Sequence, residues 1–182
     1  MENNSIEMLV HTALTAHKEP EAVLIITDNR ESIQRELDRY KFLKLDLTIS
    51  STADILETLQ NTTENSLDVV IIDGEIGNSL TIFAHSNRAL KRDGLISTRG
   101  DFATLKVLAS EFRIAMPYLV NSLEEKSTTL LFGSKFYHPT ADINLQRADF
   151  IEGCNYYSSD IQYSAFIMPN FIKSKIKEFV KN

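Results

Sequence analysis

The chain has 182 residues, 43% of them hydrophobic and 24% charged, which is the size and composition of a single domain with its own core. A formal net charge of −6 leaves no basic surface, so nucleic acid and anionic membranes are not expected as partners, whereas a polycation would be attracted. The single cysteine, Cys154, rules out an intrachain disulfide, and the absence of a leader segment or of an apolar run near the roughly 20 residues of a membrane span predicts a cytoplasmic protein.

The first part of the sequence predicts helices that alternate with buried strands. Apolar residues recur at helical spacing before Pro20, and a continuous apolar run of strand length follows it, as in a strand that is covered on both faces of a parallel sheet. Ser50 and Ser51 offer helix caps. The expected elements are a helix over residues 6–17, a strand over 22–26, a helix over 30–40, a strand over 45–49 and a helix over 53–60.

The second part continues the alternation and then changes period. An apolar strand over residues 68–72 precedes a helix over 80–90, a turn at 92–94, a strand over 95–98 and a helix over 101–112. Two strand-like runs follow one another directly, which indicates an antiparallel hairpin at one edge of the sheet. These runs cover residues 113–120 and 128–134, and helices over 141–150 and 169–181 close the chain.

Repeated strand and helix units predict an α/β fold, with a doubly wound, mostly parallel sheet. The C-terminal antiparallel hairpin narrows this to the arrangement of S-adenosylmethionine-dependent methyltransferases, a Rossmann-like fold. No internal repeat or linker divides the chain, so residues 1–182 are expected to form one domain. In such sheets the ligand lies at the carboxyl ends of the central strands.

The last thirty residues carry the most informative motif. Tyr156 and Tyr157 precede several polar residues, Asp160 and an Ala-Phe-x-x-Pro run that ends at Pro169. This segment resembles the end of spermidine synthases, the polyamine aminopropyltransferases. Other motifs resemble that family in the same order along the chain: Glu7-Met8 with His11, His17-x-x-Pro20, the apolar run 23–26, Leu90-Lys91-Arg92-Asp93-Gly94 and residues 130–135.

The resemblance implies a role in polyamine biosynthesis. An active member would be a transferase that moves a group from decarboxylated S-adenosylmethionine, or from S-adenosylmethionine, to an amine such as putrescine. Tyr156 and Tyr157 would then lie beside the substrate, although a tyrosine pair is also common in protein cores. The family's N-terminal β domain, which covers the site and assembles the oligomer, has no counterpart before the first helix, so this chain resembles the C-terminal domain of a divergent member.

The loop after the first strand departs from the family. Family members have glycines there, because the substrate nucleotide lies close to the backbone. Residues 27–32 of this chain contain no glycine, and their side chains are expected to fill that space, with Arg30 across the cleft. Asp28 and Asn29 are the residues that best tolerate such a loop conformation, and they remain the candidates for cofactor binding.

The second candidate region follows the strand over residues 45–49. Nucleotide-binding sheets of this kind place a carboxylate there for the ribose hydroxyls. This chain is shorter than the family by about one strand and one helix, so the strand could match the family's second or third. In either register the tip consists of Ile49, Ser50 and Ser51, and only Ser51 is a candidate for nucleotide contact.

Candidate catalytic residues follow the strand over 68–72. Aminopropyl transfer needs an amine that has lost its proton and is held in line with the sulfonium carbon. Asp73 matches the first aspartate of the family's catalytic loop, and Glu75 could replace the second, which falls on Ile76. Asp73 followed by Gly74 is also an ordinary turn. The histidines show no metal-ligand spacing, so no metal is expected.

Two functions remain open from the sequence. In the first, favoured here, the chain is a pseudoenzyme: a spermidine synthase-like protein that has lost its nucleotide loop, needs no cofactor and acts as a non-catalytic or regulatory subunit. In the second, it is an aminopropyltransferase or methyltransferase with a reshaped site. Apolar surface around Met8 and Leu14, or the hairpin edge, is expected to be exposed in a monomer, which predicts a homodimer or a partner protein.

Overall fold

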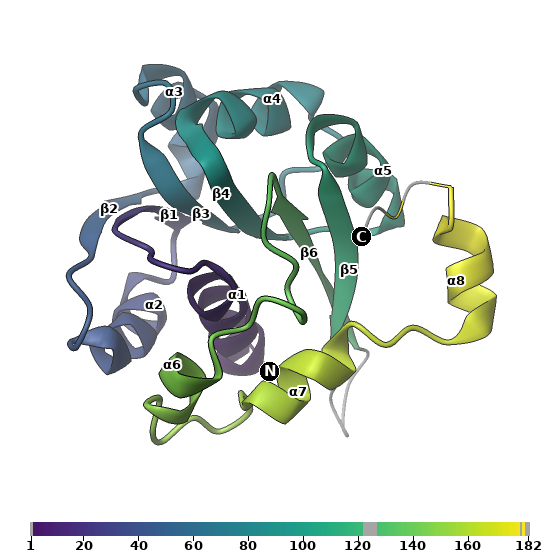
Figure 1. Ribbon diagram of the computed structural model, residues 1–182. Coiled ribbons are helices and arrows are strands. Elements are labelled where there is room, and N and C mark those ends of the chain that lie inside the picture. The colour runs from purple at the N-terminus through teal and green to yellow at the C-terminus, as the bar shows by residue number, and fades with distance from the viewer. Residues whose placement is uncertain (1, 122–126, 179, 181–182) are drawn as a thin grey trace.

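The computed structural model describes residues 2–121, 127–178 and 180, and a single mixed sheet runs through it (Figure 1). In the part of the chain that is described, this sheet has six strands in the order β2-β1-β3-β4-β6-β5, one fewer than the seven of the methyltransferase fold. The strands are β1 (Ala22–Thr27), β2 (Asp46–Ser50), β3 (Leu67–Asp73), β4 (Leu90–Arg99), β5 (Ile114–Val120) and β6 (Thr128–Ser134). The expected sheet is thus confirmed, including its width.

The pairing of the strands is also as expected. β2, β1, β3 and β4 are parallel, and β6 is antiparallel to both β4 and β5. β2 pairs directly with β1 and ends the sheet on that side, so it occupies the second-strand position. The missing strand and helix are therefore the ones that would lie beyond β2.

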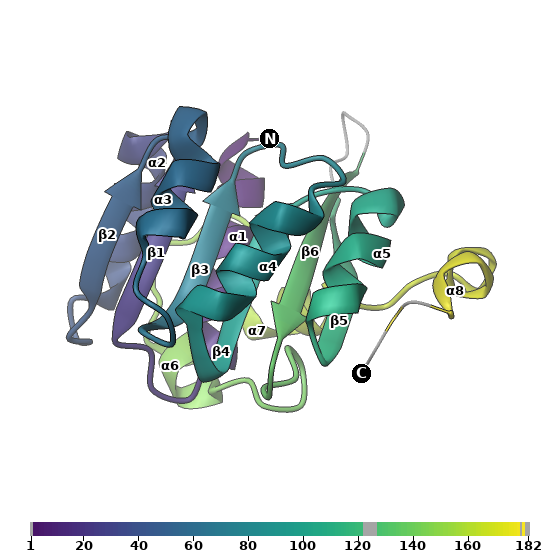
Figure 2. The ribbon, with the colours of Figure 1, turned by 90° about the horizontal axis from the view of Figure 1, so that it is seen from above.

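Helices cover both faces of the sheet, as Figure 2 shows. The helices are α1 (Glu2–Ala16), α2 (Arg30–Leu37), α3 (Ile55–Asn61), α4 (Leu80–Ala89), α5 (Phe102–Glu111), α6 (Leu145–Asp149), α7 (Ser159–Ala165) and α8 (Asn170–Ile176), with short 3-10 turns η1 (Asp38–Tyr40) and η2 (Thr52–Asp54). Alternate residues of the strands point to opposite faces, which explains two cores: Val23 and Ile25 pack under α1 and α2, whereas Leu24 and Ile26 pack under α3, α4 and α5. None of the described helices is long and apolar enough to span a membrane.

Three expected elements differ from the structure. The turn expected at 92–94 lies inside β4, where the register with β3 shifts between Leu67 and Val69 and the extra residues bulge out. α7 was not expected, although Ser158 caps it by accepting a hydrogen bond from the Ile161 N–H. The last helix, α8, ends at Ile176, and residues 179 and 181 of its expected range lie outside the described part of the chain.

Helix α1 is a central element rather than an exposed one. The expectation of an open apolar surface around Met8 and Leu14 is wrong, because both side chains are 0% exposed in the single chain. α2, α6 and the C-terminal segment cover the helix, and Tyr157 belongs to the same core. A homodimer through α1 would therefore bury little. Pairing through the hairpin edge, where β5 ends the sheet, stays a prediction.

Two buried charged side chains fasten α1 to the end of the chain. The Glu7 carboxylate accepts hydrogen bonds from the backbone N–H groups of Asn155, Tyr156 and Tyr157, at 3.1, 2.8 and 2.9 Å. The Arg147 guanidinium, on α6, donates to three carbonyl oxygens at the C-terminal end of α1, each at 2.6 Å. The carbonyls at the end of a helix have no partners within the helix, so Arg147 supplies donors to Leu14 in the last turn and to His17 and Lys18 directly after it.

A buried polar cluster joins α1 to α2 and η1. The His11 ring contacts the Tyr40 hydroxyl through Nδ1 at 2.8 Å and the Glu36 carboxylate through Nε2 at 3.1 Å, while Arg39 donates to Glu36 at 2.6 Å. Burial lowers the pKa of His11, which keeps the ring neutral. Burial also raises the pKa of Glu36, but hydrogen bonds from His11 and Arg39 outweigh this and lower it to about 2.

This cluster predicts a loss of stability in acid. A carboxyl group whose pKa is lower in the folded than in the unfolded state stabilises the fold above its unfolded pKa of 4.5, and that contribution disappears as the pH falls toward 2. His11 acts in the same direction, because the unfolded chain binds its proton more readily below pH 6.5. We expect Glu36 to contribute about 3 kcal/mol at pH 7. Urea unfolding between pH 7 and pH 3 measures it, and Glu36→Gln should flatten the slope; an equally steep slope in that variant would contradict the assignment.

Candidate functional site

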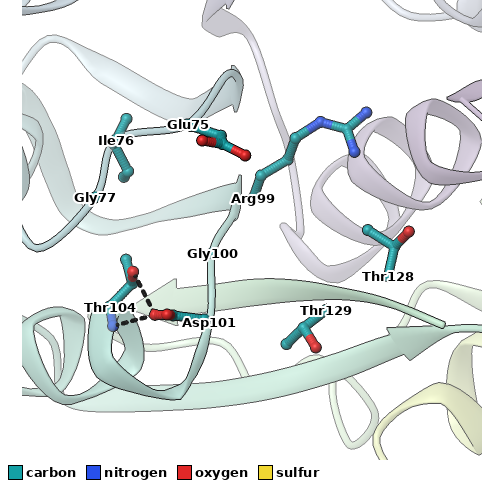
Figure 3. A pocket seen from close by; sticks show the side chains of 9 residues that line it. All are labelled: Glu75, Ile76, Gly77, Arg99, Gly100, Asp101, Thr104, Thr128 and Thr129. Carbon is teal, nitrogen blue, oxygen red and sulfur yellow. Dashed lines mark hydrogen bonds between the residues drawn. The ribbon is translucent and has the colours of Figure 1, made fainter. Parts of the chain in front are cut away.

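The candidate site lies where the carboxyl ends of β1, β3 and β4 meet. Thr27 and Asp73 are register partners in adjacent strands, and Arg99 ends β4 one residue after the pair Ile72 and Thr98. A cavity of about 410 Å³ opens at this edge. Figure 3 shows its lining: Glu75, Ile76, Gly77, Arg99, Gly100, Asp101, Thr104, Thr128 and Thr129. The parallel sheet thus places a pocket at the edge where the sequence predicts one.

Asp73 is held by three side chains of the same protein. Its Oδ1 pairs with the Arg99 Nε at 2.6 Å, and its Oδ2 accepts hydrogen bonds from the Thr27 hydroxyl and the Asn29 side-chain amide, both at 3.0 Å. The Asp73 side chain is 0% exposed, whereas that of Arg99 is 22% exposed. The carboxylate is therefore neutralised internally and buried beneath the guanidinium that neutralises it.

A second cavity of about 380 Å³ adjoins the first and reaches the loop after β1. Asn29, Asp73, Glu75 and Arg99 contribute to its lining, together with Ser5 of α1. Glu75 is exposed and lines both cavities, so it is the candidate carboxylate that a ligand can reach. The structure therefore brings Asp73 and Glu75 to one edge but leaves only Glu75 accessible.

Asp101, which lines the cavity of about 410 Å³, also caps a helix. Its carboxylate accepts hydrogen bonds from the backbone N–H and the hydroxyl of Thr104, both at 2.8 Å, and so caps the first turn of α5 (Figure 3). Those two hydrogen bonds lower the pKa of Asp101. The aspartate is thereby kept ionised, its Oδ1 is occupied by the helix cap, and it adds negative charge beside Arg99.

The loop after β1 is closed by bonds to the loop after β2. Asp28 accepts a hydrogen bond from the Ser51 hydroxyl at 2.7 Å, another from the Thr52 N–H at 3.1 Å and a third from the Thr52 hydroxyl. The hydrogen bond from the Thr52 hydroxyl, followed by that from Ser51, lowers the pKa of Asp28. Asp28 and Ser51, both candidates for nucleotide contact, thus bind one another.

The backbone of this loop differs from a glycine loop. Asn29 has a φ of −94°, and among the described residues the only non-glycine residue with a positive φ is Asn65, far from the loop. α2 begins at Arg30, immediately after Asn29, so helix replaces the open turn. Arg30 itself is exposed and lies outside the lining of both cavities, which corrects the expectation that it crosses the cleft; the cation that enters is Arg99.

The two tyrosines expected at the substrate lie away from both cavities. The Tyr157 hydroxyl donates to the Gln162 side-chain oxygen at 2.7 Å and lies 3.2 Å from the Thr15 hydroxyl, inside the core around α1. The Tyr156 hydroxyl accepts a hydrogen bond from the Asn121 N–H at 2.8 Å. Burial raises the pKa of Tyr157. Of the two interpretations open from the sequence, the contacts favour packing for Tyr157.

Arg99 is the site residue that sequence reasoning missed. A signal was present, because Arg99 follows a buried strand by the same offset as Asp73 follows the neighbouring one. Parallel strands that end together bring such residues side by side. The pairing requires the register between β3 and β4, and the bulge near Leu67 shifts that register in a way that the sequence does not show.

Comparisons with known proteins agree with this fold and with the motifs. No family model matches the chain. Curated polyamine aminopropyltransferases from Bacillus subtilis and Thermoanaerobacter sp. are 25% and 27% identical to it, each over 94% of this chain and 77% of their own length. The resemblance to this family that the motifs indicate is therefore confirmed along nearly the whole chain.

Solved structures give the same fold. A spermidine synthase in complex with the transition-state analogue AdoDATO has a TM-score of 0.83 and 19% identity, over 97% of this chain and 76% of its own. The spermidine synthase from Thermotoga maritima has a TM-score of 0.80 and 20% identity, over 97% and 75%. At these identities the likeness establishes the methyltransferase-like α/β architecture.

Proposed function

We propose that this chain, similar to spermidine synthases over nearly its whole length, is a non-catalytic member of that fold and acts as a regulatory or interaction subunit. The observation that carries the proposal is the ion pair between Asp73 and Arg99. In the likeness to the family, Asp73 takes the place of the carboxylate that anchors the substrate amine. Here that carboxylate already holds a cation supplied by the chain.

The ion pair opposes catalysis for a direct physical reason. A substrate ammonium would have to displace a guanidinium that makes a charge-assisted hydrogen bond at 2.6 Å, in a place where the aspartate side chain is 0% exposed. Thr27 and Asn29 occupy the second carboxylate oxygen, so it cannot accept a proton from an amine without losing two hydrogen bonds. The positive charge of Arg99 would also repel a sulfonium donor nearby.

The nucleotide side of the cleft supports the same proposal. Asp28 is the carboxylate that links the loops after β1 and β2, and its oxygens are taken by Ser51 and Thr52. A ribose would need those acceptors free. α2 begins at Arg30, so the loop has no open stretch of backbone for a nucleoside such as methylthioadenosine to lie against.

Titration calorimetry and an activity assay test the proposal together. We expect no heat of binding with decarboxylated S-adenosylmethionine, S-adenosylmethionine or methylthioadenosine up to millimolar concentration. We also expect no spermidine from putrescine, with an active aminopropyltransferase assayed in parallel as the positive control. Turnover that is lost in Glu75→Gln would overturn the proposal, since Glu75 is the candidate catalytic carboxylate that is exposed in the cleft.

A further inference from the structure

Another cavity, lined by polar residues and of about 400 Å³, lies at the amino ends of the strands, on the opposite edge of the sheet from the cleft. Four segments meet there: His17 follows α1, Asp68 is the second residue of β3, Asp93 lies in the bulge of β4, and Tyr137 follows β6. These residues are far apart in the sequence. Their convergence results from the parallel sheet and the bulge.

His17 is buried in this cavity with one nitrogen unsatisfied. Its side chain is 3% exposed, and Nδ1 accepts a hydrogen bond from the Glu19 N–H at 3.2 Å. Nε2 has no hydrogen-bond partner, and the Asp68 Oδ1 stands 4.0 Å away, too far for a direct bond. Buried polar atoms are almost always paired, so an unpaired ring nitrogen that faces a carboxylate indicates something that belongs between them.

Both carboxylates are oriented from behind, as metal ligands are. The Asp68 Oδ2 accepts the backbone N–H groups of Glu21 and Ala22, at 3.0 and 2.8 Å, and Oδ1, the oxygen nearer His17, pairs with the Lys91 Nζ at 2.9 Å. The Asp93 Oδ2 accepts the Tyr137 hydroxyl at 3.3 Å. Outer partners of this kind fix the direction of ligand atoms and are typical of metal sites.

The spacing of the three ligand atoms suits one ion. One nitrogen of His17 and one oxygen from each of Asp68 and Asp93 lie within 4.8 Å of one another. Ligands about 2.1 Å from a shared ion lie roughly 3–4 Å apart, so a small closing movement of half-buried Asp93 completes the set. The lining of the cavity is negative overall. Its four carboxylates, those of Glu19, Glu21, Asp68 and Asp93, outnumber its two cations, Lys18 and Lys91.

The His11, Glu36 and Cys154 cluster provides an internal contrast, since its ligand atoms are equally close together. There both ring nitrogens have partners, and Arg39 occupies the Glu36 carboxylate. Burial raises the pKa of the Cys154 thiol to about 11, so it is not a thiolate. Each cluster has a carboxylate paired with a cation of the chain, Glu36 with Arg39 and Asp68 with Lys91, but only the His17 cluster leaves a histidine nitrogen unsatisfied.

We propose that His17, Asp68 and Asp93 bind a divalent transition-metal ion such as Zn²⁺, with a remaining coordination position open to solvent. Binding requires the His17 ring to present a lone pair at Nε2, so its proton moves to Nδ1 and the Glu19 N–H turns to water. Lys91, whose side chain is 36% exposed, leaves the Asp68 Oδ1 for solvent. The ion would join the α1–β1 loop to β3 and β4, and so stabilise the sheet at the amino ends of its strands.

Zinc titration of the purified 182-residue chain tests this site. We expect one Zn²⁺ per chain, a higher melting temperature with zinc, and a change of the His17 tautomer, from protonated Nε2 to protonated Nδ1, in the ¹⁵N shifts of the imidazole. Asp93→Asn removes one ligand at a half-buried position and should weaken binding at least tenfold, and Tyr137→Phe should weaken it roughly 10- to 100-fold through the lost orienting bond.

Asp54→Asn is the matched control, because it removes an exposed carboxylate in η2, beyond the opposite ends of the strands, and should leave zinc affinity unchanged. If the wild-type chain shows no binding at millimolar zinc, or if Asp93→Asn binds as tightly as wild type, the proposal is wrong. A zinc signal that leaves the His17 shifts unmoved also overturns it, since surface histidines would then be the ligands. The cleft plays no part in these measurements, so their outcome is independent of the proposed function.

Discussion

Replacing Glu7 by alanine is expected to lower the free energy of unfolding by about 3–5 kcal/mol. Glu7 is 2% exposed, and its carboxylate is the acceptor for three consecutive backbone N–H groups in residues 155–157. Alanine leaves those donors without a partner, and each unsatisfied buried donor costs about 1–3 kcal/mol. Urea unfolding followed by circular dichroism measures the loss.

Two further variants separate this effect from a general sensitivity to mutation. Glu7→Gln keeps one carbonyl oxygen as an acceptor and should cost less than alanine, because part of the bonding survives. Glu64→Ala removes an exposed glutamate in a loop and should change stability by less than about 0.5 kcal/mol. Equal losses for Glu7→Ala and Glu64→Ala would show that the carboxylate does not hold the C-terminal segment.

Replacing Arg99 by alanine is expected to cost about 3 kcal/mol and to create a binding site for cations. The substitution leaves the Asp73 carboxylate, with a side chain 0% exposed, without its only ion-pair partner among the described residues. Asp73→Asn combined with Arg99→Ala removes the unpaired charge and should recover much of the loss. Thermal unfolding of the single and double variants measures both effects.

Added diamine distinguishes this interpretation from simple loss of packing. Putrescine should raise the melting temperature of Arg99→Ala, because an ammonium can occupy the place of the guanidinium, and it should leave the wild type and the double variant unchanged. Stabilisation of the wild type by putrescine to the same extent would mean that an amine reaches the cleft with Arg99 in place. That result would contradict the proposed internal block.

The sequence predicted the fold well because its signals were local and strong. Continuous apolar runs such as the one in β1 and the one in β3 have few alternatives to buried parallel strands, and the hairpin followed from two adjacent strand-like runs. The exposure of α1 was predicted wrongly, since it depends on what covers the helix. Tyr157 and α6 do so from more than 120 residues away, and no local pattern records that contact.

The candidate site was predicted only in part, for a related reason. Asp73 could be located because a carboxylate at the end of a buried strand is visible in the sequence. The ion pair of Asp73 with Arg99 could not be predicted, because Arg99 lies on the neighbouring strand and the register of that strand pair includes a bulge. The cavity around His17 was not predicted either. Metal-ligand spacing along the sequence involves histidines close to one another, whereas the fold brings one histidine after α1 together with carboxylates from β3 and β4.

The bonds between Glu7 and residues 155–157 also constrain how the protein comes to be folded. They join residues up to 150 positions apart, so a chain emerging from the ribosome completes α1 long before the N–H groups that bind Glu7 have been synthesised. Until then the buried face of α1, including Met8 and Leu14, has no full cover. Contacts of such long range slow folding, and until they form the apolar face of α1 is exposed to solvent and to other chains. Molecular chaperones that shield apolar segments would find their substrate in this helix.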